Sequence, residues 1–202
     1  MKIIRKQDLT TRKWSGGTTT ELAIWPEGAV YAERDFLWRL STAEVLDETS
    51  TFTSLPDYYR FLTTRKGNLK IRHDGGEWYE LTPGKITGFE GGSLTESEGR
   101  VTDFNLMVRK DKVEGNLSAA ILPGTGEAVP VFTLFRELAG GQPDRMAALY
   151  ASDGALTVAW QDREITLGAG EMILFGPEDP AGGCTVRACG ETLVLCAMMD
   201  VC

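Results

Sequence analysis

Apolar residues along the chain occur in short segments of strand length that are separated by glycine-rich turns. In residues 68–72 and 156–160, apolar positions either alternate with polar ones or follow one another, over the length of a strand. Both segments contain β-branched or aromatic side chains. Turn signals such as His73-Asp74-Gly75-Gly76 and Ser152-Asp153-Gly154 bound such segments. The best helix candidate, Thr133–Ala139, is short and is followed by two glycines. The pattern therefore predicts an all-β protein built from antiparallel strands.

An internal repeat relates residues 67–89 to residues 154–175. In each copy a glycine opens a strand, a hairpin follows, and a second glycine makes the corner before another apolar strand. Glycine-bounded hairpins also recur by chance in β-rich chains, which is the alternative interpretation. The order resembles the central hairpins of the cupin jelly roll, a double-stranded β-helix. Two copies predict two cupin-like barrels, and we expect domains at residues 1–116 and 117–202.

The length and the charge of the chain exclude some classes of function. The 202 residues, 42% of them hydrophobic, suffice for one sizeable core or two closely joined small ones. The formal net charge is −8, and no Lys/Arg cluster interrupts the acidic background, which argues against binding to nucleic acid or to an anionic membrane. No apolar run has the length of a signal peptide or a membrane span, so we expect a cytoplasmic protein.

Residues that commonly bind metals are scarce. The single histidine, His73, lies just before a predicted turn, and we interpret it as an exposed turn residue rather than as a ligand or base. Metal-dependent cupins use two or three histidines with a carboxylate, and catalytic triads need an imidazole base. We therefore expect no metal and no other cofactor, although an all-carboxylate site stays open.

The four cysteines lie near the C-terminal end of the sequence and include no Cys-x-x-Cys pair. We interpret them as small buried strand side chains in a reducing compartment rather than as a metal or disulfide framework. They are Cys184, Cys189, Cys196 and Cys202.

Two arginines stand in segments that are otherwise aromatic and apolar. Arg39 and Arg60 each carry a guanidinium group, which suits bidentate recognition of a carboxylate. The alternative is that both lie on the solvent face of their strands. Strand alternation places Asp103, Asn105 and Met107 on one face of another segment, which favours a shared polar surface.

Four motifs together resemble the HutD/Ves family of bicupins. They are residues 14–22, residues 34–41, residues 52–56 with Arg60, and residues 103–107. The second half of the chain matches only through the repeat and the length. The resemblance implies a pocket in the N-terminal half without the usual metal-binding histidines. It also implies a link, in some bacteria, to histidine utilisation, with a regulatory role and an intermediate such as formylglutamate as the suggested ligand.

The resemblance also supplies the site residues, because motif positions carry over one by one. The expected pocket residues are Trp14, Thr19, Glu21, Arg39, Ser41, Arg60, Asp103 and Asn105. One position departs from the family pattern. Many relatives have Phe-x-Gly-Asp where this chain has Phe89-Glu90-Gly91-Gly92, so no role of that aspartate transfers.

Three functions follow as hypotheses. In the first, the protein binds a small anionic metabolite, with Arg39 or Arg60 pairing its carboxylate and Trp14 covering an apolar part. In the second, it is a metal-independent lyase, isomerase or hydrolase in which Glu21 or Asp103 is the general base after burial raises its pKa. In the third, the second barrel is mainly an interaction face that forms a homodimer.

Overall fold

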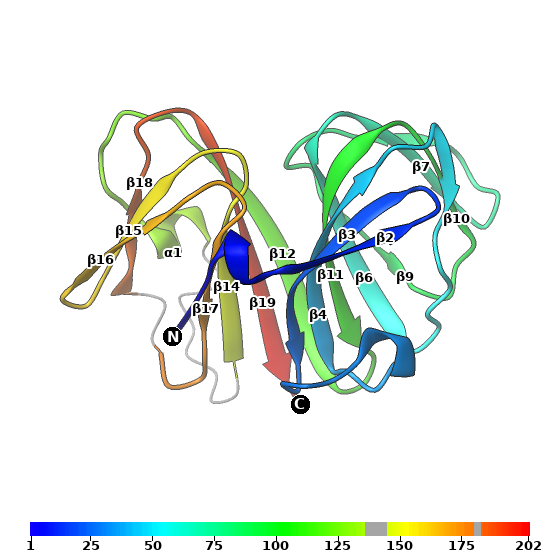
Figure 1. Ribbon diagram of the computed structural model, residues 1–202, viewed down its shortest axis with the longest axis horizontal. Coiled ribbons are helices and arrows are strands. Elements are labelled where there is room, and N and C mark those ends of the chain that lie inside the picture. The colour runs from blue at the N-terminus through cyan, green and yellow to red at the C-terminus, as the bar shows by residue number, and fades with distance from the viewer. Residues whose placement is uncertain (136–144, 180–182) are drawn as a thin grey trace. The chain divides into compact units, whose positions relative to one another are not determined.

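The computed structural model describes residues 1–135, 145–179 and 183–202, and most of these residues lie in β-strands (Figure 1). By their contacts, they divide into two compact units. The N-terminal unit comprises residues 9–115 with Cys202, and the C-terminal unit comprises residues 1–8 and 116–201. The prediction of an all-β protein is confirmed. In the described residues no helix is long and apolar enough to cross a membrane.

The N-terminal unit contains two sheets. The first has the strand order β2-β3-β4-β11-β6-β9, and the second has the order β5-β10-β7-β8. A short 3-10 helix, η2 (Tyr31–Glu33), lies between β3 and β4. The strands are β2 (Thr10–Trp14), β3 (Gly17–Trp25), β4 (Trp38–Val45), β5 (Thr49–Thr51), β6 (Tyr58–Lys66), β7 (Leu69–His73), β8 (Tyr79–Leu81), β9 (Thr87–Glu90), β10 (Thr95–Glu98) and β11 (Val101–Arg109).

The C-terminal unit also contains two sheets, with the orders β1-β17-β14-β19-β12 and β13-β18-β15-β16. Its helical elements are η1 (Lys6–Asp8) and α1 (Val131–Leu134). The helix expected over residues 133–139 overlaps α1 only at its start, and residues 136–139 lie outside the described residues. The strands are β1 (Lys2–Ile4), β12 (Val113–Leu122), β13 (Val129–Pro130), β14 (Arg145–Ala151), β15 (Leu156–Trp160), β16 (Arg163–Leu167), β17 (Met172–Phe175), β18 (Thr185–Arg187) and β19 (Thr192–Val201).

The repeat in the sequence corresponds to a repeat in strand order. The order β9-β6-β11-β4 in the N-terminal unit matches β17-β14-β19-β12 in the C-terminal unit, and β8-β7-β10-β5 matches β16-β15-β18-β13. Local alternation explains the strands themselves. In β15, for example, Leu156, Val158 and Trp160 are buried while the intervening residues are partly exposed. Each unit is therefore a complete two-sheet barrel of the same topology.

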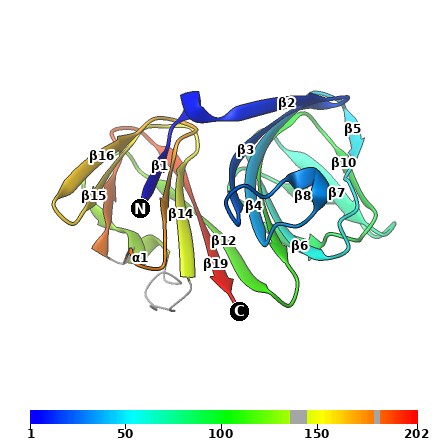
Figure 2. The same ribbon diagram turned by 60° about the horizontal axis from the view of Figure 1, so that its bottom comes forward.

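The N-terminal segment does not follow the expected domain division. Residues 1–8 belong to the C-terminal unit, because β1 pairs with β17, with Ile3 opposite Ile173. Arg5 adds an ion pair to Glu171, with 2.6 Å between Nη1 and Oε2. Figure 2 shows this strand beside those of the C-terminal unit. The other limit, between Gly115 and Asn116, lies one residue before the expected one.

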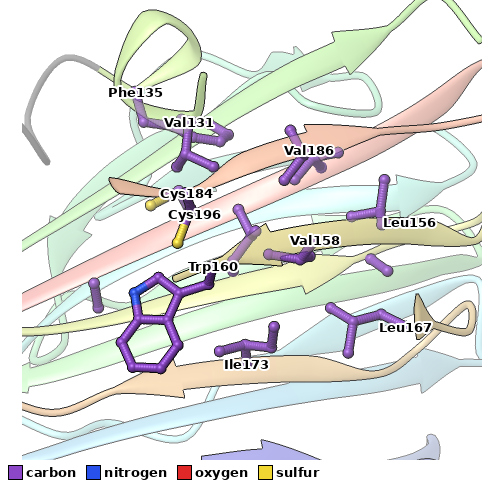
Figure 3. Packing of buried hydrophobic residues seen from close by; sticks show 14 of the residues in the cluster. Val131, Phe135, Leu156, Val158, Trp160, Leu167, Ile173, Cys184, Val186 and Cys196 are labelled. Carbon is purple, nitrogen blue, oxygen red and sulfur yellow. The ribbon is translucent and has the colours of Figure 1, made fainter. Parts of the chain in front are cut away.

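The C-terminal unit has a continuous apolar core, in which Trp160, Ile173 and Val186 pack together (Figure 3). Cys184 and Cys196 are buried in this core, as expected. The expectation is wrong for Cys189 and Cys202, which are exposed. Cys189 lies in a bend between β18 and β19, and Cys202 follows the end of β19, so neither belongs to the inward face of a strand.

Candidate ligand site in the N-terminal unit

Polar side chains gather on one face of the six-stranded sheet, on its adjacent strands β4, β11 and β6. Met107 lies opposite Arg39 on β4 and opposite Arg60 on β6. Asn105, two residues earlier on β11, lies opposite Ser41. Since residues directly opposite in an antiparallel pair share a face, these side chains point to the same side of the sheet. All of them are buried.

Arg39 is fixed and neutralised by its neighbours. Its Nε donates to Oε2 of Glu21 at 2.7 Å, and its Nη1 donates to the hydroxyl of Ser41 at 3.0 Å. The guanidinium carbon lies 4.4 Å from the centre of the Tyr31 ring, a cation–π geometry. This arginine thus already has a carboxylate partner within the protein.

Arg60 has no such partner in the described hydrogen bonds. Its side chain is buried, and its guanidinium carbon lies 4.9 Å from the centre of the Phe52 ring and 5.3 Å from that of Phe89. Nη1 donates to the carbonyl of Thr53 at 3.5 Å, while the buried Nε has no hydrogen-bond partner among the described residues. Burial lowers the pKa of Arg60 to about 10, so the group stays positively charged at neutral pH.

Asp103 places a buried carboxyl group beside these arginines. Its Oδ1 accepts a hydrogen bond from the backbone N–H of Ala43 at 2.8 Å. Burial raises the pKa of Asp103 to about 6, against the opposing effects of that hydrogen bond and of the charges on Arg60, Arg65 and Arg39. The group therefore titrates close to neutral pH.

Asn105 completes the central polar group. Its Oδ1 is buried and has no hydrogen-bond partner among the described residues. A buried polar atom without a partner costs free energy, so the presence of Asn105 Oδ1 and Arg60 Nε on one face of the sheet calls for an explanation. The two orphan atoms are of opposite kind, since Nε of Arg60 is a donor and Oδ1 of Asn105 is an acceptor.

The remaining two expected residues lie further along the same sheet. Thr19 is half-buried on β3, opposite Ala43 and two residues from Glu21, and so shares their face. Trp14 stands at the end of β2, is 41% exposed, and lies over Gly16, where a larger residue would collide with its ring. Glu21 and Arg39 thus belong to the polar side chains on this face of the sheet, whereas Trp14 lies at the corner of the hairpin between β2 and β3.

The sequence analysis did not identify a second polar group, which is centred on His73 of the four-stranded sheet. His73 Nδ1 lies 2.8 Å from the hydroxyl of Thr95, and Nε2 lies 2.8 Å from the hydroxyl of Tyr79. That hydroxyl in turn lies 2.7 Å from the hydroxyl of Thr87. The imidazole packs on Phe89, with 4.5 Å between ring centres, and burial lowers its pKa.

The expectation that His73 is an exposed turn residue is therefore wrong. The turn begins one residue later, at Asp74, and His73 is the last, half-buried residue of β7. The signal was present in the sequence, because His73 continues the alternation of Leu69 and Ile71, which are both buried.

The register also identifies the equivalent positions in the C-terminal unit. Arg60 lies opposite Phe89 and Met107, and its counterpart Ala147 lies opposite Phe175 and Met198. By the same pairing, the counterparts of Asp103, Asn105, Tyr79 and Thr87 are Val194, Cys196, Ile165 and Ile173. His73 corresponds to Trp160, which packs on Phe175. The barrel topology is thus built without these polar residues.

A metal bound in the manner of other cupins does not fit these side chains. Within residues 1–135, 145–179 and 183–202, no three His, Cys, Asp or Glu side chains are grouped so that they could hold a metal ion. The one histidine has both ring nitrogens in hydrogen bonds with hydroxyl groups. The donor set is thus unlike the histidine-rich sites that transition metals prefer.

Two barrels of this strand order in one chain define a bicupin. A cupin 2 conserved barrel domain protein from Leptotrichia buccalis has a similar fold, with a TM-score of 0.55 and 13% identity over 100% of this chain and 96% of that one. The family model named HutD matches residues 6–194, and the chain belongs to the HutD family. The resemblance found in the sequence and the cupin fold are both confirmed.

Two solved structures cover nearly the whole chain. One is PA5104 from Pseudomonas aeruginosa PAO1, a conserved protein of unknown function, with a TM-score of 0.78 and 22% identity over 98% of each chain. The other is HutD from Pseudomonas fluorescens SBW25, with a TM-score of 0.71 and 19% identity over 100% of this chain and 98% of that chain. At these identities the likeness shows the fold. No curated protein sequence matches this chain.

Proposed function

We propose that this protein binds a small carboxylate metabolite, without a metal, inside the barrel of its N-terminal unit. The observation that carries the proposal is the buried guanidinium of Arg60, whose Nε has no acceptor among the described residues. A carboxylate is the natural acceptor, because two of its oxygens can pair with the edge of a guanidinium. The rings of Phe52 and Phe89 contact the guanidinium without offering it a hydrogen-bond acceptor.

Asn105 supports a more detailed description of the ligand. Its Oδ1 offers an unused acceptor on the same face of the sheet. A ligand that carries an N–H or O–H group near its carboxylate would satisfy both orphan atoms at once. Arg39 is the weaker anchor of the two arginines, because Glu21 already neutralises it. Trp14 is a weaker candidate for a ligand cover, since its ring rests on Gly16.

The family supplies the first candidate ligands. Its link to histidine utilisation suggests that binding regulates or buffers amino-acid metabolism, with intermediates such as formylglutamate as ligands. HutD from Pseudomonas fluorescens was solved in a formate condition, and formate is the smallest carboxylate. We therefore choose formate, glutamate, histidine, urocanate and formylglutamate as the test set.

A thermal-shift titration tests the proposal. We expect at least one of these carboxylates to raise the Tm of the wild-type protein, because selective binding to the folded state stabilises it. The rise should disappear in Arg60→Met and persist in Arg72→Met. Arg72 is a suitable control because it lies on β7 and pairs with Glu96, at 2.8 Å between Nε and Oε2. Equal shifts in both variants, or no shift for any of the carboxylates, would contradict the proposal.

A second candidate function rests on Asp103. A buried carboxyl group that titrates near neutral pH is suited to general-base catalysis, for example in a lyase, an isomerase or a hydrolase. Glu21 is less suited to this role, since it is held by Arg39. Turnover of a bound carboxylate that disappears in Asp103→Asn, while binding persists, would favour the enzyme. If the carboxylate binds but is not converted under the same conditions, the enzyme hypothesis is rejected and a binding function remains.

A further inference from the structure

The buried face of the six-stranded sheet holds charges that nearly balance. Arg39 and Glu21 form one ion pair, which leaves Arg60 and Asp103 as the second cation and the second carboxyl group. An anion at Arg60 would add a negative charge within the electrostatic range of Asp103. We infer that Asp103 takes up one proton when the barrel binds an anionic ligand, so that ligand and proton enter together. This inference rests on the proposed function, because it requires an anion at Arg60.

The surroundings of Asp103 favour proton uptake when an anion binds nearby. The side chain is 7% exposed, its Oδ1 accepts a hydrogen bond from the backbone N–H of Ala43, and the residue lies opposite Thr64 on β6. Burial and this hydrogen bond hold the carboxyl group in the interior, away from water. A buried carboxylate that meets a second negative charge becomes neutral by protonation, since the ionised form is the costly one.

Two other arginines also lower the pKa of Asp103, each less than Arg60 does. Arg39 is paired with Glu21, and Arg65 donates to the hydroxyl of Thr42 at 3.0 Å from Nη1. His73, on β7, is within the electrostatic range of Arg60, and burial lowers its pKa, so it is neutral at neutral pH. The arginine that a ligand engages is thus also the one whose charge most lowers the pKa of Asp103.

The direction of the linkage follows from these contacts. In the free protein, burial already raises the pKa of Asp103 to about 6. A bound anion repels the carboxylate and engages Arg60, and both effects raise the pKa further. Between the free and the bound pKa, binding takes up at most one proton, so the affinity falls by up to about tenfold for each unit by which the pH rises. Below the free pKa, the affinity is independent of this group.

Carbon-13 NMR on protein with labelled aspartate measures the effect directly. The Asp103 carboxyl signal is titrated with pH, first without and then with saturating formate. Formate binding itself is followed by the nitrogen-15 signal of Arg60 Nε. We expect formate to move the Asp103 midpoint upward by about one pH unit or more. In Asp103→Asn, formate affinity should be independent of pH, while Glu44→Gln, which alters an exposed carboxylate on β4, should keep the dependence.

The two possible failures are distinct. If formate shifts the Arg60 Nε signal but leaves the Asp103 midpoint in place, the proton uptake is refuted and the carboxylate site stands. If formate leaves the Arg60 signal unchanged, the site at Arg60 is refuted together with the uptake. The carbon-13 titration uses the wild-type protein, so it does not depend on the folding of Asp103→Asn.

Discussion

In the C-terminal unit, Trp160 packs on Phe175 within a continuous apolar core. In the N-terminal unit, His73 takes the corresponding place, packs on Phe89 and bonds to two hydroxyl groups. The strand order around both aromatic pairs is the same. The two barrels therefore differ in what fills them and not in how their strands are connected.

The difference separates residues that the topology needs from residues that it does not. The apolar partners are kept, with Phe89 and Met107 matched by Phe175 and Met198. The polar residues are replaced, and Arg60 is matched by Ala147. Buried polar groups cost free energy unless every one is paired, and Arg60 Nε is not paired among the described residues. Such a costly interior is consistent with a role in binding.

The largest effect is expected when the polar interior is transferred to the apolar barrel. Ala147→Arg places a charge at a site that is 4% exposed and surrounded by an apolar core. We expect the C-terminal unit to lose about 5 kcal/mol or more of stability, because the ion loses its hydration without gaining a partner. Urea unfolding followed by circular dichroism measures the loss. Thr166→Arg, on the exposed side of β16, should change stability by about 0.5 kcal/mol or less.

A smaller loss is expected when the packing aromatic is removed from each barrel. Trp160→Ala should cost about 3–4 kcal/mol, since it leaves a cavity in the apolar core. His73→Ala should cost about 1–2 kcal/mol, because it removes a half-buried ring and its two hydrogen bonds. The same unfolding measurement compares them. A larger loss for His73→Ala would mean that its hydrogen bonds are a main support of the N-terminal barrel.

The third prediction concerns the pH dependence of stability, which should differ between the wild-type protein and Asp103→Asn. Because burial raises the folded-state pKa from 3.8 to about 6, the contribution of this group is fully present below pH 3.8 and is lost as the pH rises through about 6. The full difference is about 3 kcal/mol, from 1.36 kcal/mol for each pKa unit. Asparagine cannot ionise, so the stability of Asp103→Asn relative to the wild-type protein should rise by up to about 3 kcal/mol as the pH increases from 3.8 to above about 6. Parallel stability curves for the two proteins would contradict the assignment.

The smallest effect on stability is expected for Arg60→Met, which makes the N-terminal barrel more like its counterpart. Methionine can pack against Phe52 and Phe89 without an unpaired charge, so stability should change by about 1 kcal/mol or less. Carboxylate binding should be lost in the same protein. A large loss of stability, measured by unfolding, would instead make Arg60 a structural residue.

Strand alternation explains why part of the site was predicted. Asp103, Asn105 and Met107 were placed on one face from their spacing alone, and the register confirms that placement. Arg39 and Arg60 were chosen because a charged residue in an aromatic strand is unusual, and both are buried. The shared face of Asp103, Asn105 and Met107 could be inferred because it depends only on a local period of two residues.

Contacts between distant segments explain what was missed. Phe89 contacts Arg60 from β9, and this contact depends on a strand pairing between residues far apart in the sequence. The position of β1 was missed for the same reason, since its partner β17 lies near the other end of the chain. His73 was assigned to a turn because its neighbours Asp74 and Gly75 are turn residues, and the end of β7 was placed one residue too early.

The pairing of β1 with β17 has a consequence for synthesis on the ribosome. Synthesis runs from the N-terminal to the C-terminal end, so β1 emerges before its partner, which follows only after the whole stretch 9–115. That stretch contains all the strands of the N-terminal unit and can close its barrel while β1 waits unpaired. A strand that is translated before the whole N-terminal unit thus pairs only after that unit has been made, and completion of the five-stranded sheet depends on a contact of high sequence separation.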